Sequence, residues 1–227
     1  MFRNYFLLFI SCFGLLFLLQ CKEHTSQSVN EITTSQPSKG VVGGPFENRD
    51  FFFIGMPRPI QSIDTSAGWS QKGQKLLIKG TIYKRDGVTP APNVILYYYH
   101  TDVNGLYSDK PDLDRRVVRH GYIRGWVQSD VNGKYSIYTA RPAPYPNSDQ
   151  PAHIHPAIKE PTINIPYYID EFVFDDDAFL TNAKRKDMED RGGNGILKVK
   201  KDSYLQIAEH DIILGMNIPN YPESEKD

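Results

Sequence analysis

Residues 122–139, YIRGWVQSDVNGKYSIYT, contain the pattern that decides the fold. Two short runs rich in aromatic and β-branched residues flank the turn sequence Asp130-Val131-Asn132-Gly133. Asn-Gly accepts the positive φ angles of a tight turn more readily than other pairs, so the stretch predicts a β-hairpin. Residues 101–108, TDVNGLYS, repeat residues 129–136, SDVNGKYS, and predict a second turn of the same kind. Calcium binding is the alternative interpretation of the repeat, although each copy offers few of the carboxylates that a full oxygen cage needs.

Short apolar runs separated by turn residues continue through residues 46–227. No amphipathic repeat of helical length lies between the runs, a spacing typical of antiparallel strands in two packed sheets. We therefore predict an all-β fold, an antiparallel β-sandwich of about eight strands with long loops. The strand candidates are residues 76–83, 94–100, 122–128, 134–139, 152–158, 196–199, 204–208 and 211–216. Residues 177–191, which end at Gly192-Gly193, predict one short helix.

The composition excludes several classes of protein. With 227 residues, 40% of them hydrophobic and 23% charged, the chain is long and apolar enough for a folded domain and is not disordered throughout. Its 26 Lys and Arg residues are balanced by 27 Asp and Glu residues, which leaves a formal net charge of -1. Such a chain lacks the positive field that attracts phosphate backbones, so we expect no nucleic-acid partner.

The N-terminal residues have the profile of an export signal. One basic residue, Arg3, precedes fifteen uncharged residues, 5–19, a run shorter than the roughly 20 residues of a membrane-spanning helix. The sequence Leu18-Leu19-Gln20-Cys21 resembles a bacterial lipobox, whose cysteine carries the lipid. We expect a signal peptide at residues 1–20, lipidation of Cys21, a flexible tether at 21–45 and one domain at 46–227. The protein would then be an exported, membrane-anchored lipoprotein at the periplasmic or cell surface; a secreted protein cleaved nearby is the alternative.

Residues 153–155, His-Ile-His, carry the first chemical signal. Alternate residues of a strand face the same side, so His153 and His155 can bind one metal ion while Ile154 packs on the other side. The chain also contains 14 tyrosines. Phenolate binds a metal only where a highly charged cation offsets its ordinary pKa of about 10, and Fe(III) does so better than Zn(II) or Fe(II). Two imidazoles, two phenolates and a hydroxide would leave a ferric ion formally neutral.

Five motifs occur in order between residues 80 and 158. They are Gly80 with Pro92-Asn93-Val94, Asp102-x-Asn104-Gly105-x-Tyr107, Arg124-Gly125 to Asp130-x-x-Gly133-x-Tyr135, Pro144-Tyr145-Pro146, and Pro151-Ala152-His153-Ile154-His155. In this combination the segment resembles the catalytic core of the intradiol ring-cleavage dioxygenases, which include protocatechuate 3,4-dioxygenase and catechol 1,2-dioxygenase.

The resemblance implies a mononuclear non-haem Fe(III) site with Tyr107, Tyr145, His153 and His155 as ligands. It implies that a small aromatic diol binds the iron, that Tyr145 also accepts a substrate proton, and that O₂ opens the ring to a muconate-type diacid without an organic cofactor. Gln150 stands where the family has an arginine thought to stabilise the carbanion-like substrate; as the second predicted catalytic residue it can donate a hydrogen bond but supplies no charge.

Further residues near these motifs are predicted to affect the strand, the substrate or the packing around the site. Pro156 follows the second histidine and lacks an N–H, which predicts a strand edge, a bulge or an early strand end. The candidates to contact a substrate carboxylate are Arg115, Arg116, Arg119 and Arg124. The residues interpreted as structural are His100, His120, Trp126 and Tyr135. Two alternatives to the enzyme stay open: a surface lipoprotein of the same fold that binds iron or a catecholate ligand with little or no turnover, and an adhesive sandwich without metal.

Overall fold

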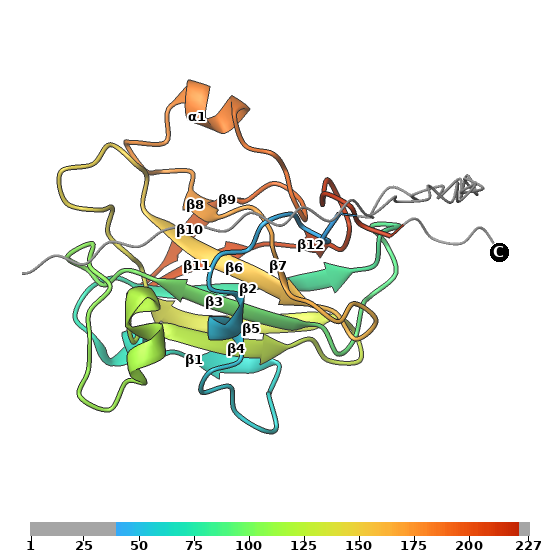
Figure 1. The fold of residues 1–227 in the computed structure, drawn as a ribbon. Coiled ribbons are helices and arrows are strands. Elements are labelled where there is room, and N and C mark those ends of the chain that lie inside the picture. Colours follow the sequence, from blue (N-terminus) through green and yellow to red (C-terminus); the bar gives the residue numbers. More distant parts are fainter. Residues whose placement is uncertain (1–39, 223–227) are drawn as a thin grey trace, which may run out of the picture. The chain divides into compact units, whose positions relative to one another are not determined.

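A computed structural model describes residues 40–222, which form two β-sheets packed through one hydrophobic core (Figure 1). The predictions for residues 1–39, including the signal peptide and the lipidation of Cys21, lie outside these residues. The end of the predicted tether contacts the domain, because Val42 packs against the core and the Gly43 N–H donates to the Pro219 carbonyl at 2.7 Å. Among residues 40–222, none of the helices has the length and hydrophobicity needed to span a bilayer.

The first sheet is built around a central antiparallel pair, β2 and β5. Its strand order is β1 (Ile63–Thr65), β5 (Lys134–Ala140), β2 (Lys75–Tyr83), β11 (Leu205–Glu209) and β10 (Val199–Asp202), and β12 (Ile212–Ile213) also pairs with β2. The second sheet is built around β3, which pairs antiparallel with both of its neighbours. Its order is β4 (Arg124–Gln128), β3 (Ile95–His100), β6 (His153–Lys159), β8 (Phe172–Phe174) and β9 (Ile196–Leu197), and β7 (Tyr167–Tyr168) also pairs with β6.

The predicted all-β sandwich is confirmed, with one difference in strand direction. Four pairings are parallel: β1 with β5, β2 with β11, β2 with β12, and β8 with β9. Parallel neighbours need a long crossover connection, and the long loops of this chain supply it. The helices are short: η1 (Arg49–Phe52), η2 (Ala67–Ser70), η3 (Arg115–His120) and α1 (Asn182–Lys186). The predicted helix at 177–191 is reduced to α1, which begins after Thr181, whose Oγ1 accepts the Lys184 N–H.

The predicted hairpin at residues 122–139 is wrong, although its turn forms. Oδ1 of Asp130 accepts the N–H groups of Asn132 and Lys134, both at 2.8 Å, which closes the turn locally. The flanking strands then separate, since β4 pairs with β3 in the second sheet and β5 pairs with β2 in the first. Oδ1 of Asp102 accepts two N–H groups in the same way, so both carboxylates of the repeat stabilise turns. Both copies of the repeat therefore form turns, but neither turn joins two strands of a tight hairpin, because residues 101–108 lie in the connection from β3 to η3.

Strand β3 is buried on both of its faces. Leu96 and Tyr98 point into the core between the sheets, where they join buried side chains of both sheets. Tyr97 and Tyr99 point the opposite way, into an outer cluster with Phe52 and Trp126. Each such buried aliphatic or aromatic side chain contributes about 1.5–3 kcal/mol to folding. The second sheet therefore has a covered outer face, and this face carries the site described below.

A buried histidine at the end of β3 predicts acid sensitivity. Nδ1–H of His100 donates to the Thr101 carbonyl at 2.7 Å, and Nε2 accepts from Oγ1 of Thr139 at 2.8 Å. Burial lowers the pKa of His100 to about 4. Between pH 6.5 and about 4 this histidine binds a proton in the unfolded chain but not in the folded protein, so the free energy of unfolding falls as the pH falls. We expect His100 alone to lower the free energy of unfolding by about 3 kcal/mol at pH 4 relative to pH 7.

Urea unfolding of the metal-free protein at pH 7 and pH 4.5 measures this effect. The variant His100→Gln, which cannot titrate, is expected to show a smaller pH dependence even if it is less stable at pH 7. An equal pH dependence in the variant and the wild type would contradict the assignment to His100.

Candidate metal centre

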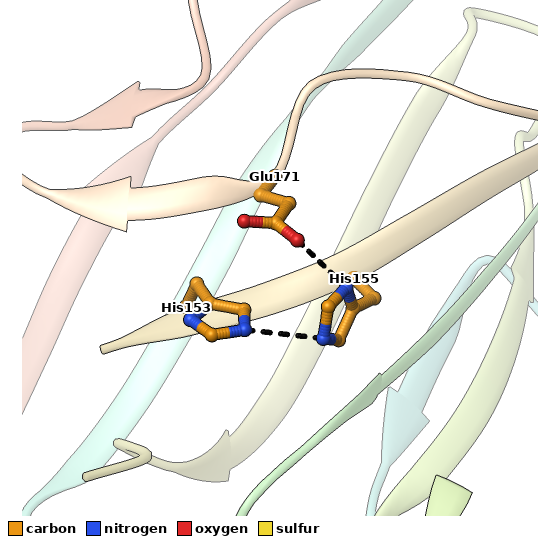
Figure 2. Close-up of side chains that lie close together, drawn as sticks. All are labelled: His153, His155 and Glu171. Atoms are coloured by element: carbon orange, nitrogen blue, oxygen red, sulfur yellow. Dashed lines mark hydrogen bonds and ion pairs between the residues drawn. The ribbon is translucent and has the colours of Figure 1, made fainter. Parts of the chain in front are cut away.

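Strand β6 places two imidazoles on the outer face of the second sheet. His153 and His155 point to this side, whereas Ile154 lies in the core on the opposite side. Nδ1–H of His153 donates to the Pro151 carbonyl at 2.8 Å, and Nδ1–H of His155 donates to Oε1 of Glu171 at 3.0 Å. In a neutral imidazole the other nitrogen then carries a lone pair. The two Nε2 atoms face each other at 3.1 Å (Figure 2).

Two loops bring the tyrosines to the same point. The Tyr107 hydroxyl lies 2.6 Å from the Tyr145 hydroxyl and 2.7 Å from Nε2 of His155. The Tyr145 hydroxyl lies 3.1 Å from Nε2 of His153 and 3.4 Å from Nε2 of His155. The structure therefore brings together all four residues that the sequence resemblance implied as metal ligands.

The two tyrosine loops are held against each other by their backbones. Oγ1 of Thr101 donates to the Ala143 carbonyl at 2.7 Å, and the Ala143 N–H donates to the Asp102 carbonyl at 3.1 Å. Gly105 has a φ of +77°, and a Cβ at this position would lie 2.0 Å from the Pro144 carbonyl oxygen. Only glycine permits both the turn and this close approach. The turn that the sequence predicts at residues 101–108 is thus what positions Tyr107 beside Tyr145.

The four donor atoms fit one metal ion. Metal bonds to nitrogen and oxygen ligands are about 2 Å long, so ligands of one ion lie roughly 3 Å apart. The five separations given above range from 2.6 to 3.4 Å. Two imidazole lone pairs that face each other without a proton between them repel, and a cation between them removes the repulsion. Phenol oxygens and imidazoles are donors that suit iron.

Burial favours the protonated, neutral form of the Tyr107 and Tyr145 side chains. It raises the pKa of Tyr107 well above its ordinary value, and the hydrogen bond with Tyr145 raises it further. Burial also raises the pKa of Tyr145. Both side chains therefore stay neutral at physiological pH unless a strongly charged cation replaces their protons.

Glu171 is a member of the site that the sequence reasoning missed. It lies directly before β8 and, with His153 and His155, belongs to a group of possible metal ligands. Its carboxylate contacts Nδ1 of His155, the nitrogen that points away from the other three donor atoms, so its geometry is that of a group that orients a ligand. Burial acts to raise the pKa of Glu171, but the hydrogen bond from His155 and the electrostatic influence of the nearby His155 and His153 lower it below the ordinary value. The available signal was a carboxylate within the otherwise apolar residues 171–174, EFVF.

The strand pairing beside Pro156 explains how Glu171 reaches this position. Strand β8 pairs with residues 153–154 and β7 with residues 157–158, which leaves Pro156 opposite the gap between the two partner strands. The missing N–H of Pro156 is therefore tolerated, and β6 continues to Lys159 instead of ending early. Residues 169–171 cross this gap and carry Glu171 to His155.

A cavity of about 400 Å³ opens beside the four donor atoms. Tyr107, Tyr145 and His155 line it together with Arg119 and Glu171. The predicted catalytic residue Gln150 lines a neighbouring cavity instead, which it shares with Glu171.

Of the four arginines named as candidates to contact a substrate carboxylate, Arg119 is the one that lines the cavity. Arg115 pairs with Asp109, and Arg116 pairs with Asp114. Nη2 of Arg124 donates to the carbonyls of Phe51 and Ile54, at 2.8 and 2.7 Å, and its guanidinium lies over the ring of Trp126.

The residues interpreted as structural have packing roles. His120 stacks on Tyr99 with ring centroids 3.7 Å apart, and its Nδ1 lies 2.8 Å from the Tyr97 hydroxyl. Nε1 of Trp126 donates to the Phe52 carbonyl at 2.7 Å. The Tyr135 hydroxyl donates to the His210 carbonyl at 2.9 Å, on the side of the first sheet. Sequence spacing does not distinguish Tyr107 from Tyr135, but the structure does.

Comparison with known proteins agrees with this geometry. A family model described as "Dioxygenase" matches residues 57–190. The chain belongs to this dioxygenase family. The resemblance to intradiol ring-cleavage dioxygenases that the motifs indicated is thereby confirmed.

Individual relatives of this dioxygenase-family chain cover part of its length. Over 119 residues it is 29% identical to hydroxyquinol 1,2-dioxygenase from Corynebacterium glutamicum, a match over 52% of this chain and 35% of that protein. Over 134 residues it is 30% identical to chlorocatechol 1,2-dioxygenase from a Pseudomonas species, over 52% of this chain and 49% of that protein. The chain thus spans at most about half the length of these two relatives. Wild-type catechol 1,2-dioxygenase from Acinetobacter radioresistens has the same fold, with a TM-score of 0.55, 19% identity, and coverage of 83% of this chain and 65% of that chain.

Proposed function

We propose that this protein is a non-haem Fe(III)-dependent intradiol dioxygenase that opens a catechol-type aromatic ring with O₂ to a muconate-type diacid. The observation that carries the proposal is the convergence of two phenol oxygens and two imidazole nitrogens, with neighbouring donor atoms 2.6–3.4 Å apart, at the wall of a cavity. The names of the two curated relatives, a hydroxyquinol and a chlorocatechol 1,2-dioxygenase, support the substrate class.

Different residues would have different roles at such a site. Ferric iron held by Tyr107, Tyr145, His153 and His155 would act as a Lewis acid that favours binding of the diol as its anion. Tyr145 is the ligand suited to accept a diol proton, because its hydroxyl contacts the other donor atoms from a half-buried position on the cavity wall. His155 is kept in place by Glu171 at Nδ1 and by the ring of Tyr99, whose centroid lies 4.6 Å from its own.

The visible spectrum of the purified, iron-analysed protein tests the proposal. Phenolate bound to Fe(III) gives a charge-transfer band that colours the protein red, and we expect this band to shift when catechol is added. We also expect one O₂ to be consumed for each catechol that is cleaved. Iron-replete protein without colour would contradict the ferric tyrosinate site. A band that shifts without O₂ uptake would support instead the alternative of a protein that binds catechols without opening the ring.

A further inference from the structure

We propose that the cavity selects catechols without an anionic substituent, and that the carboxylate of Glu171 is the group that makes this selection. The inference rests on the proposed function, since it assumes that the diol binds at Tyr107, Tyr145 and the two histidines. It concerns the part of the ring that does not contact the metal.

The charged side chains on the cavity wall leave an unbalanced negative charge. Arg119 and Glu47 pair with each other, with Nη2 3.4 Å from Oε1, and both are more than two-thirds exposed at the rim. His120 adds no positive charge, because burial lowers its pKa to about 3. Among the described residues that line the cavity, Glu171 is then the charged side chain that pairs with no Lys or Arg; its contact there is the imidazole of His155.

Glu171 is held close to the position of the diol. Its Oε1 lies 3.0 Å from Nδ1 of His155, and Nε2 of the same ring lies 2.7 Å from the Tyr107 hydroxyl. The side chain is 40% exposed and lines this cavity as well as the neighbouring cavity of Gln150. A ring bound at the donor atoms therefore lies within about one ring length of this carboxylate.

An additional carboxylate on the ring would be repelled by the carboxylate of Glu171, and no unpaired cationic side chain among the described residues of the cavity wall would offset this repulsion. A metal held by the four donor residues would offset the charge of the two diol oxygens, whereas the cationic side chain on the cavity wall that a ring carboxylate could reach is Arg119, which already pairs with Glu47. Arg124 is not available, because its guanidinium donates to two backbone carbonyls outside the cavity. Two like charges about 8 Å apart in a partly exposed site repel enough, after screening by salt, to weaken binding roughly tenfold.

Anaerobic titration of the iron-loaded protein measures this selection without turnover. The probes are 4-methylcatechol as the neutral ring, protocatechuate as the anionic ring and dopamine as the cationic ring, and the readout is the Kd obtained from the shift of the charge-transfer band. We expect protocatechuate to bind at least about tenfold more weakly than 4-methylcatechol, with a smaller ratio at high salt. Dopamine is expected to bind at least as tightly as 4-methylcatechol.

The variant Glu171→Gln separates charge from position. A glutamine oxygen can still accept the Nδ1–H of His155, so the variant is expected to bind iron up to about 100-fold more weakly but to keep the resting band once it is loaded with iron. In the iron-loaded variant the ratio of the two Kd values is expected to fall several-fold towards one. Comparing this ratio with that of the wild type cancels the intrinsic difference between the two diols. The matched control is Glu209→Gln, which removes the same charge from an exposed residue of β11 that pairs with Lys79, and its ratio should equal that of the wild type.

Two results would overturn the inference while leaving the proposed function intact. The first is a normal charge-transfer band together with protocatechuate binding as tightly as 4-methylcatechol. If the variant Arg119→Ala then bound protocatechuate more weakly, Arg119 would be the residue that binds the ring carboxylate. The second is an unchanged ratio in Glu171→Gln. Failure of the proposed function itself would appear differently, as iron-loaded protein without the band.

Discussion

Replacement of Tyr107 by phenylalanine is expected to weaken iron binding by about a hundredfold or more and to remove most of the visible band. Changes to groups that only orient a metal ligand cost about 10–100-fold in metal affinity, so loss of a ligand should cost at least as much. The Tyr107 hydroxyl also contacts the Tyr145 hydroxyl and Nε2 of His155, so two further donors lose a neighbour. Iron analysis, the visible spectrum and O₂ uptake with catechol measure the effect.

The matched control for this variant is Tyr135→Phe. Tyr135 occupies the equivalent position in the repeated octapeptide, but its hydroxyl donates to the His210 carbonyl at 2.9 Å, on the side of the other sheet. We expect the control to keep its iron and its colour and to lose about 1 kcal/mol of stability with the hydrogen bond. Equal spectra for the two variants would show that Tyr107 is not a ligand.

Replacement of Gly80 by alanine is expected to destabilise the domain by about 3 kcal/mol or more, or to prevent soluble expression. Gly80 lies within β2, where an added Cβ would lie 1.7 Å from the His210 carbonyl oxygen. The segment that would have to move is tied to β2 on both sides: the His210 N–H donates to the Lys79 carbonyl, and Oδ1 of Asp211 accepts the Thr81 N–H at 2.7 Å.

Urea unfolding of the two proteins, or their soluble yield, measures the effect of Gly80→Ala. Gly44→Ala serves as the control, since an added Cβ there meets no atom within 4 Å and costs only the strain of a positive φ, about 1 kcal/mol. Wild-type stability of Gly80→Ala would mean that β2 and the segment at His210 are not packed as described.

The site could be predicted from the sequence to the extent that its donors lie in recognisable local motifs. His153 and His155 alternate on one strand, and the turn at residues 101–108 depends on Gly105, so both features are encoded within a few residues. Glu171 is different, because its role comes from the gap between β7 and β8 opposite Pro156. Gln150 shows the same limit, since its place in the chain beside the histidine pair did not indicate that it lines a separate cavity.

The sequence by itself determined the all-β class, the two Asp-x-Asn-Gly turns and the two imidazoles on one face, because turn geometry and strand alternation depend on neighbours in the chain. The tertiary structure decided that β4 and β5 leave their shared turn for different sheets, that Tyr107 and not Tyr135 meets the histidines, and that Glu171 contacts His155. The physical reason is that a turn closes with its own backbone hydrogen bonds whichever sheet its strands join. The choice of sheet depends on burying apolar faces against distant strands, and this choice places the long loops that carry the donors.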